Sequence, residues 1–194
     1  RLKSPDDYFF INLTGSFQQY KLNNWVTSSG TSALFSFSDG NSNVFAAQAR
    51  FARRSIQEPF WITQGSETSI SVKATPPFSA IGNNRNVVYT DLTPAERYKL
   101  AEFHKWKFTT QWFTKLTRSK SKHDFVFMAR AGFGFLGRYT KRKGDSPFER
   151  FYLGGSGLTG FQLDGREIIA LRGYDDLSLT PSTGSFFVNK YTAE

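Results

Sequence analysis

The chain contains no cysteine, which excludes disulfide bonds and thiolate metal sites from all 194 residues. Histidine is also scarce, because only His104 and His123 occur, too few for a metal centre built on several imidazoles. No run approaches the roughly 18 apolar residues that a membrane-spanning helix needs. No signal peptide is visible, the first residue is not Met, and the last residues continue a predicted strand, so we expect a fragment of a longer protein.

The chain is poor in hydrophobic residues overall but rich in aromatic ones. The hydrophobic fraction is 39% and the mean hydropathy is −0.44, yet 21 Phe, eight Tyr and four Trp make up 17% of the residues. A soluble core of this size would use more Leu, Ile and Val. Many aromatic residues within a polar average indicate a wall with one apolar and one polar face, as in a transmembrane β-barrel.

Alternating apolar and polar residues predict β-strands, because successive side chains of a strand point to opposite faces. The predicted strands are residues 8–20, 43–53, 67–75, 103–116, 124–138 and 186–194. Several are about 9 to 13 residues long, enough to cross a bilayer when tilted. Their polar faces carry Lys and Arg, which a water-filled barrel can hold but a sandwich core cannot bury unpaired. The predicted fold is all-β: an antiparallel up-and-down transmembrane β-barrel, here a partial barrel of about six strands.

The strand ends and connections carry further signals. Aromatic residues gather at the strand ends, as in the interfacial girdles of barrels: Tyr8, Phe9, Tyr20, Trp25, Trp61 and Tyr139. The formal charge is +9, and basic residues cluster at 118–122 and 141–143, which we interpret as turns and loops near charged head groups. A basic surface for nucleic acid is the alternative, but the aromatic residues form no stacking motif of a known RNA or DNA module. Residues 93–96, Thr-Pro-Ala-Glu, predict a helix start, with a short helix through Ala101.

The segment from Ser146 to Asp176 differs from the rest of the chain. It combines six glycines with aromatic residues that need packing partners. A long loop with its own aromatic anchors is expected to fold into a cavity. We therefore predict that the partial barrel holds a long inward-folded loop.

This segment resembles the lid loop of BamA-type outer-membrane assembly factors. The resemblance rests on Phe-Glu-Arg-Phe-Tyr-Leu-Gly-Gly at 148–155 and on Arg172, Gly173 and Tyr174, which match the family's Arg-Gly-aromatic tip. Residues 54–65 are similar to a periplasmic hairpin turn of that family, and 188–194 to the strand after the lid. The gap at 162–170 is longer than in the shortest family members. The residues expected to pack the lid loop are Phe148, Phe151, Tyr152, Gly154, Gly155 and Phe161.

The resemblance implies that residues 1–194 are part of one outer-membrane barrel domain without the periplasmic POTRA domains, with a lid loop at 146–180. It also implies that Arg172 lies in the lumen. A buried arginine needs a carboxylate partner, which the family has on later strands. Glu194 is a weak candidate within this chain. The alternative is an exposed Arg172 paired with Asp175 or Asp176.

The implied function is the folding and insertion of β-barrel proteins into the outer membrane of a Gram-negative bacterium. The implied partners are unfolded barrel clients, accessory subunits of the assembly complex and the lipid bilayer, with no nucleic acid. No enzyme activity, metal or cofactor is expected, because no nucleophile, base and acid form a set. Glu149 and Asp164 could form a carboxylate pair, but we expect both to be solvated loop residues. The alternatives are a related two-partner secretion pore, a passive porin and, more distantly, a soluble basic β-domain that binds nucleic acid.

Overall fold

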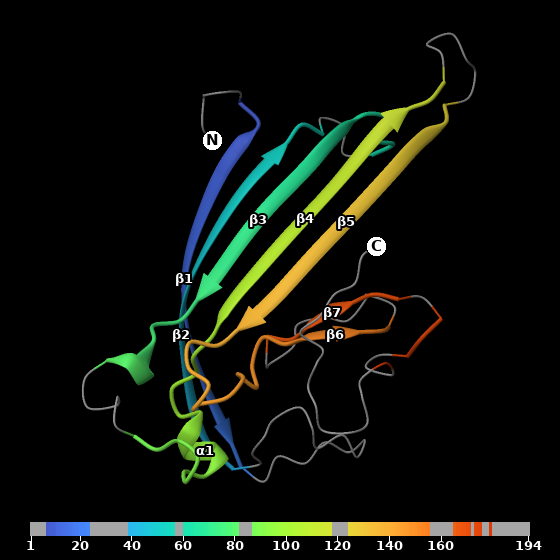
Figure 1. Cartoon of the computed structure of the whole chain (residues 1–194). Helices are drawn as coiled ribbons and strands as arrows, with labels where there is room; N and C mark the ends of the chain where they lie inside the picture. The colour runs from blue at the N-terminus through green and yellow to red at the C-terminus, as the bar shows by residue number, and fades with distance from the viewer. Residues whose placement is uncertain are drawn as a thin grey trace.

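The structure, a computed structural model, is dominated by one antiparallel sheet. It describes residues 7–23, 39–56, 60–81, 87–117, 124–155, 165–171, 173–175 and 179. The sheet contains, in this order, β1 (Phe9–Leu22), β2 (Gly40–Arg54), β3 (Gly65–Ala74), β4 (His104–Lys115) and β5 (Val126–Gly137) (Figure 1). Each strand pairs with the next one along the chain, so the predicted all-β, up-and-down fold is confirmed. The expected strand 186–194 lies outside the described residues.

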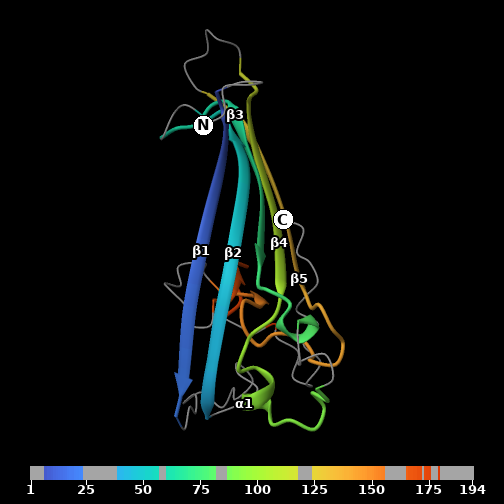
Figure 2. The same ribbon diagram turned by 90° about the vertical axis from the view of Figure 1, so that its left-hand side faces the viewer.

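The five strands form a curved, open sheet, which fits part of a barrel wall (Figure 2). They run for 10 to 15 residues, longer than the strands of most soluble sheets. In the described part of the chain, no helix has both the length and the apolar character needed to span a membrane.

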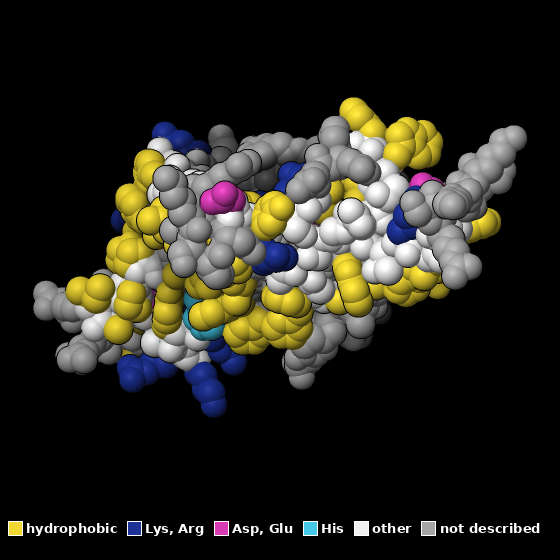
Figure 3. All heavy atoms as spheres, turned by 90° about the horizontal axis from the view of Figure 1, so that it is seen from above, with side chains coloured by type: hydrophobic (Ala, Val, Ile, Leu, Met, Phe, Trp, Pro, Cys, Tyr) yellow, Lys and Arg dark blue, Asp and Glu magenta, His cyan; other side chains and the backbone are white. Residues whose placement is uncertain are grey.

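The register gives the sheet two chemically different faces. One row across all five strands consists of Ile11, Phe51, Ile70, Phe108 and Phe133, all of them exposed. The next row contains Asn12, Arg50, Ser71, Lys107 and Gly134 and points to the opposite side. We call these the apolar face and the polar face. Figure 3 shows the apolar face as a row of hydrophobic side chains along one edge of the molecule. A soluble protein rarely exposes so large a contiguous apolar surface.

The buried core lies at the end of the sheet where the connection between β3 and β4 runs and where β5 ends; we call this the loop end. It consists of Val44, Ala46, Ala101, Phe103, Leu136, Phe148 and Phe151. The contributing segments, far apart in the sequence, are β2, the residues before β4, the end of β5 and the loop that follows β5. The core therefore fixes this loop to the sheet.

The connection between β3 and β4 contains a short 3-10 helix, η1 (Phe78–Ala80), and the helix α1 (Pro94–Arg97). The predicted helix start at Thr93 is confirmed, and Thr93 and Glu96 also form a capping box. The prediction that the helix continues to Ala101 is wrong. The chain turns to pair with β2 instead: Asn43 N–H donates to the Lys99 carbonyl at 2.8 Å, and Ala101 N–H donates to the Asn43 carbonyl at 3.0 Å.

Candidate functional site: the inner loop on the polar face

The chain after β5 returns to the polar face of the sheet. We call residues 146–155 and 165–171 the inner loop; it contains β6 (Phe151–Leu153) and β7 (Glu167–Ile169), which pair in parallel (Figure 1). Of the residues expected to pack the lid loop, Phe148, Phe151, Tyr152, Gly154 and Gly155 are buried. Phe161 lies outside the described residues. The inner loop is therefore packed rather than solvated.

Aromatic packing joins the inner loop to the strands. The ring of Phe148 stacks on the ring of Tyr20 in β1, with centroids 4.6 Å apart. Tyr20 thus packs on the side of the inner loop, and the expectation that it belongs to an interfacial girdle is wrong. The ring of Phe151 fills the space above Gly134, where an added Cβ would meet the Cζ of Phe151 at 2.6 Å. Glycine at 134 is what allows β5 and the inner loop to approach this closely.

A compact turn sets the position of Glu149. The Ser146 hydroxyl accepts from Phe148 N–H at 3.1 Å, and Arg150 Nε donates to the Ser146 carbonyl at 2.8 Å. Between them Glu149 has φ of 63°, a left-handed conformation that is uncommon for residues other than glycine. Such strain is retained where surrounding contacts favour it. At Glu149 the contacts that favour this conformation are the ion pairs of its carboxylate with Lys73 and Lys105.

That carboxylate belongs to an ion network between the inner loop and the strands. Glu149 is paired with Lys73 of β3 and, at 3.1 Å, with Lys105 of β4. Glu167 of β7 is paired with Lys107 and, at 3.4 Å, with Lys105. The register places Lys73 directly opposite Lys105, where like charges would repel each other. The two carboxylates of the inner loop therefore neutralise a cationic strip on the polar face.

Burial and charge act in opposite directions on Glu167. Burial alone would raise the pKa of this carboxyl, but Lys105 and Lys107 outweigh it and hold the pKa of Glu167 below its ordinary value. Glu167 is therefore ionised at neutral pH. The side chain of Lys105 is also buried and lies over the Phe151 ring, with Nζ 4.6 Å from the ring centroid. Its charge is thus stabilised by two carboxylates and an aromatic ring.

A polar cavity of about 390 Å³ remains between the inner loop and the strands. Hydroxyl groups and charged side chains line it, including Ser69, Ser71, Thr109 and Arg166. Among the described residues, no group of three or more His, Asp or Glu could hold a metal ion. These charged and hydroxyl groups hold the inner loop against the strands.

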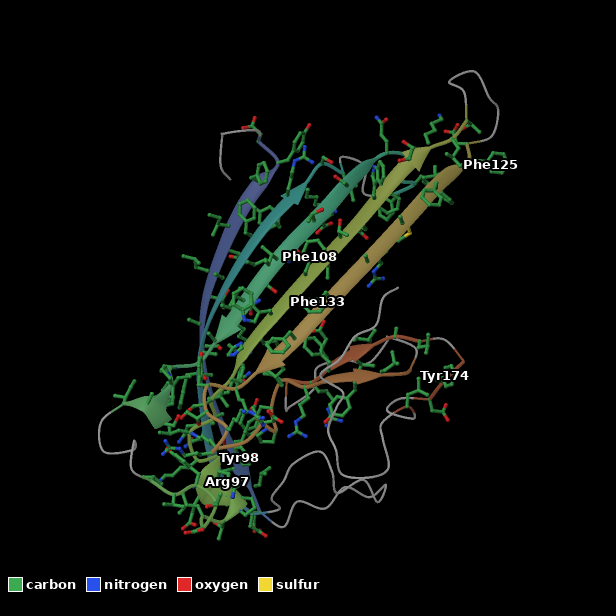
Figure 4. All side chains as sticks on the ribbon, viewed as in Figure 1. Arg97, Tyr98, Phe108, Phe125, Phe133 and Tyr174 are labelled. Atoms are coloured by element: carbon green, nitrogen blue, oxygen red, sulfur yellow. The ribbon has the colours of Figure 1, made fainter. Side chains whose placement is uncertain are left out.

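The expected lid tip is only partly described. Leu171 pairs with Gly155 in an antiparallel bridge, and Gly155 N–H donates to the Tyr174 carbonyl at 2.9 Å. Gly173 has φ of 91°, which suits glycine. The Tyr174 side chain is 51% exposed, and Figure 4 shows it beyond the ends of β6 and β7. Arg172 lies outside the described residues, as do Asp164, Asp176 and Glu194.

A second buried ion pair fixes the loops at the same end. Lys143 Nζ lies 2.8 Å from Glu102 Oε1 and donates to the Leu100 carbonyl at 2.7 Å. Glu102 also accepts from Ser79 N–H and from the Ser79 hydroxyl, both at 2.7 Å. Burial lowers the pKa of Lys143, although the hydrogen bond and charge of Glu102 oppose this shift. Residues 141–143 form a turn, as predicted, but Lys143 is buried and paired with Glu102, away from any head group.

The ion network is not predicted from the sequence. The expectation that Glu149 is a solvated loop residue is wrong, because its side chain is buried and paired. The alternation of the strands indicates only that Lys73, Lys105 and Lys107 belong to a polar face. One signal was available, because three lysines on one face of two neighbouring predicted strands require compensating acids. The sequence does not reveal that residues 44 and 62 positions beyond Lys105 supply them.

Comparison with known proteins gives one family match. The model of the Omp85 superfamily domain matches residues 11–193, almost the whole chain. No curated protein and no solved structure gives a match. The match covers β2 to β5, the inner loop and all of β1 except Phe9 and Phe10.

Proposed function

Because the chain belongs to the Omp85 superfamily, whose barrel proteins include assembly factors and secretion pores of outer membranes, we propose that it is barrel wall and lid of a BamA-type factor. Its work is to fold and insert β-barrel proteins into a Gram-negative outer membrane. Unfolded barrel clients and accessory subunits are its proposed partners. The observation that carries the proposal is the inner loop, held on the polar face by the ion network of Glu149 and Glu167.

The physical problem that such a factor solves is the exposed strand edge. A barrel strand entering lipid carries unsatisfied N–H and C=O groups until it is paired, and each is costly in hydrocarbon. An assembly factor offers an edge strand on which the client forms its first hydrogen bonds. The barrel must keep its shape while its wall exchanges partners. A lid that ties β3, β4 and the chain after β5 together supplies this rigidity.

Arg172, Gly173 and Tyr174 are proposed as the tip of this lid. The bridge between Leu171 and Gly155 supports a tip anchored to the inner loop. A carboxylate elsewhere in the full barrel is the proposed partner of Arg172, because a buried arginine requires one. Phe148, Phe151 and Tyr152 hold the base of the lid on the strands.

The proposal predicts that Arg172→Ala in the full-length protein impairs client insertion. Reconstituted into vesicles with a client barrel, the variant should yield at least tenfold less protease-resistant client in the linear phase of the reaction, since losing a buried charged hydrogen bond costs about 1.5–3 kcal/mol. The matched control is Arg130→Ala, which removes an exposed arginine of β5. Insertion by the Arg172 variant at the wild-type rate would contradict the lid assignment.

A two-partner secretion pore is the competing role within the same superfamily. It moves a soluble protein across the membrane and leaves no client in the bilayer. The same vesicles distinguish the two roles, because an insertion factor leaves its client resistant to carbonate extraction. Release of an added soluble partner into the vesicle lumen, without membrane-embedded product, would favour the pore.

A further inference from the structure

The basic segment after β5 divides between the inside and the outside of the molecule. Lys143 turns inward and is paired with Glu102. Arg138, Lys141 and Arg142 remain exposed, and Arg138 Nη1 lies 3.0 Å from Asp145 Oδ1 at the surface. Only the outer part of the segment can therefore meet another molecule.

This outer part begins at the border of the apolar face. The Tyr139 ring lies 5.4 Å from the ring of His104, and His104 Nδ1 accepts from Trp106 Nε1 at 3.1 Å. Trp106 belongs to the apolar face, so Tyr139 packs on that side of the sheet. The Tyr139 hydroxyl is held in place by the Thr75 carbonyl at 2.7 Å. Figure 3 shows Lys and Arg side chains gathered beside the histidine, just outside the hydrophobic row.

The order of side chains along this border matches the layers of a membrane surface. Trp106, Phe135 and Tyr139 are partly exposed aromatic residues at the end of the apolar face. Such rings favour the head-group level, with their apolar body in the hydrocarbon. Cations beyond them stand where the phosphates of anionic lipids lie. Arginine adds a planar set of donors that suits a phosphate.

We propose that Arg138, Lys141 and Arg142, flanked by Tyr139, form a binding site for the phosphate of an anionic lipid in the leaflet on the loop side of the barrel. Its occupant is a phosphorylated lipid, because the apolar face directly below receives the acyl chains. The site is separate from the inner loop. It rests on the membrane location that the family implies and not on insertion activity.

The test measures lipid binding by the full-length protein in detergent. The probe is lipid A carrying two phosphates, compared with its dephosphorylated form, and native mass spectrometry counts the bound lipid. We expect Lys141→Gln/Arg142→Gln to weaken binding roughly 25-fold, at about fivefold for each charge removed. Lys141→Arg/Arg142→Lys should bind as the wild type does. Lys99→Gln, which removes an exposed cation of the loop end outside the site, should have no effect.

Three outcomes would overturn the proposal. Unchanged binding by the double Gln variant would remove the site, and equal binding of dephosphorylated lipid would remove the phosphate. Displacement of the lipid by inorganic phosphate at an equal concentration would identify a free anion as the ligand instead. Heat-modifiable migration on gels verifies that each variant is folded. The double variant should still insert clients into phosphatidylcholine vesicles, so failure here is distinguishable from failure of the proposed function.

Discussion

Lys105 shows how a cation is kept on the inside of this sheet. Its side chain is buried, yet two carboxylates and an aromatic ring surround its ammonium group. Both carboxylates belong to the inner loop, so each ionic contact of Lys105 is also a contact between loop and wall. Desolvation of a buried ion is costly. When one partner of a buried pair is removed, the other charge stays desolvated without the attraction that offset this cost.

Glu149→Gln is therefore expected to loosen the inner loop. It leaves Lys73 and Lys105 without their shared carboxylate, and breaking a buried pair costs roughly 3 to 5 kcal/mol. Limited trypsin digestion of the full-length protein should then cleave at Arg150 or Arg166 at least tenfold faster. The matched control is Glu67→Gln, because Glu67 contacts Arg50 and Arg54 of the neighbouring strand, at 3.6 and 3.5 Å. Equal digestion of the two variants would show that the network does not hold the loop.

At the scale of the strand, the two-residue period decides which solvent each side chain meets. Phe108 of β4 and Phe133 of β5 lie side by side on the apolar face, as Figure 4 shows. The next pair, Thr109 and Gly132, points to the polar face. A shift of one residue in the pairing would exchange the two faces, so the register of the whole sheet is set by this alternation.

Charged substitutions should report this difference directly. Phe133→Lys places a cation in the hydrocarbon and should lower the free energy of unfolding by about 2 to 4 kcal/mol near the bilayer midplane. Gln111→Lys places it on the polar face beside the Glu67 carboxylate and should change stability by less than about 1 kcal/mol. Urea titration of the protein in phospholipid vesicles measures both. Equal destabilisation by the two variants would argue against a lipid-facing apolar face.

At the scale of the molecule, the docking of the inner loop depends on the ionised carboxylate of Glu167 and so on pH. The pKa of Glu167 lies below its ordinary value in the folded protein. A carboxyl with a lowered folded pKa stabilises the fold above its unfolded pKa, and this contribution is lost as the pH falls through the folded value. The inner loop should therefore be held at neutral pH and released below about pH 4.3, the ordinary pKa of glutamate.

Acid titration of a labelled protein measures this release. Because the chain has no cysteine, a single Ala170→Cys substitution beside β7 carries an environment-sensitive fluorophore without side reactions within it. The signal should change as the pH is lowered from 7 to 3. In the Glu167→Gln variant the fluorescence change between pH 7 and pH 3 should be smaller, because residue 167 can no longer titrate. Its inner loop should already be looser at neutral pH. Identical titration curves for the two proteins would rule out a role for Glu167.

The sequence by itself determined the sheet, because strand formation depends on a local period of two and on the turn residues between the runs. The predicted strands 8–20, 43–53, 67–75, 103–116 and 124–138 lie within three residues of β1 to β5. The apolar side of each strand follows from the same alternation, as Ile11, Phe51 and Phe133 show. The burial of Phe148 and Phe151 followed from their apolar character within a glycine-rich segment.

Only the tertiary structure decided which charges meet. Lys73 and Glu149 are 76 residues apart, and no local pattern links them. The same holds for Lys143, which is buried and paired with Glu102 while Lys141 and Arg142 stay exposed. It also holds for the end of α1, after which residues 99–101 pair with β2 instead of continuing the helix. Ion pairs and strand pairings form between groups that are close in space. Residues far apart in the sequence come close only once the sheet has folded, so their pairing cannot be predicted from the local sequence.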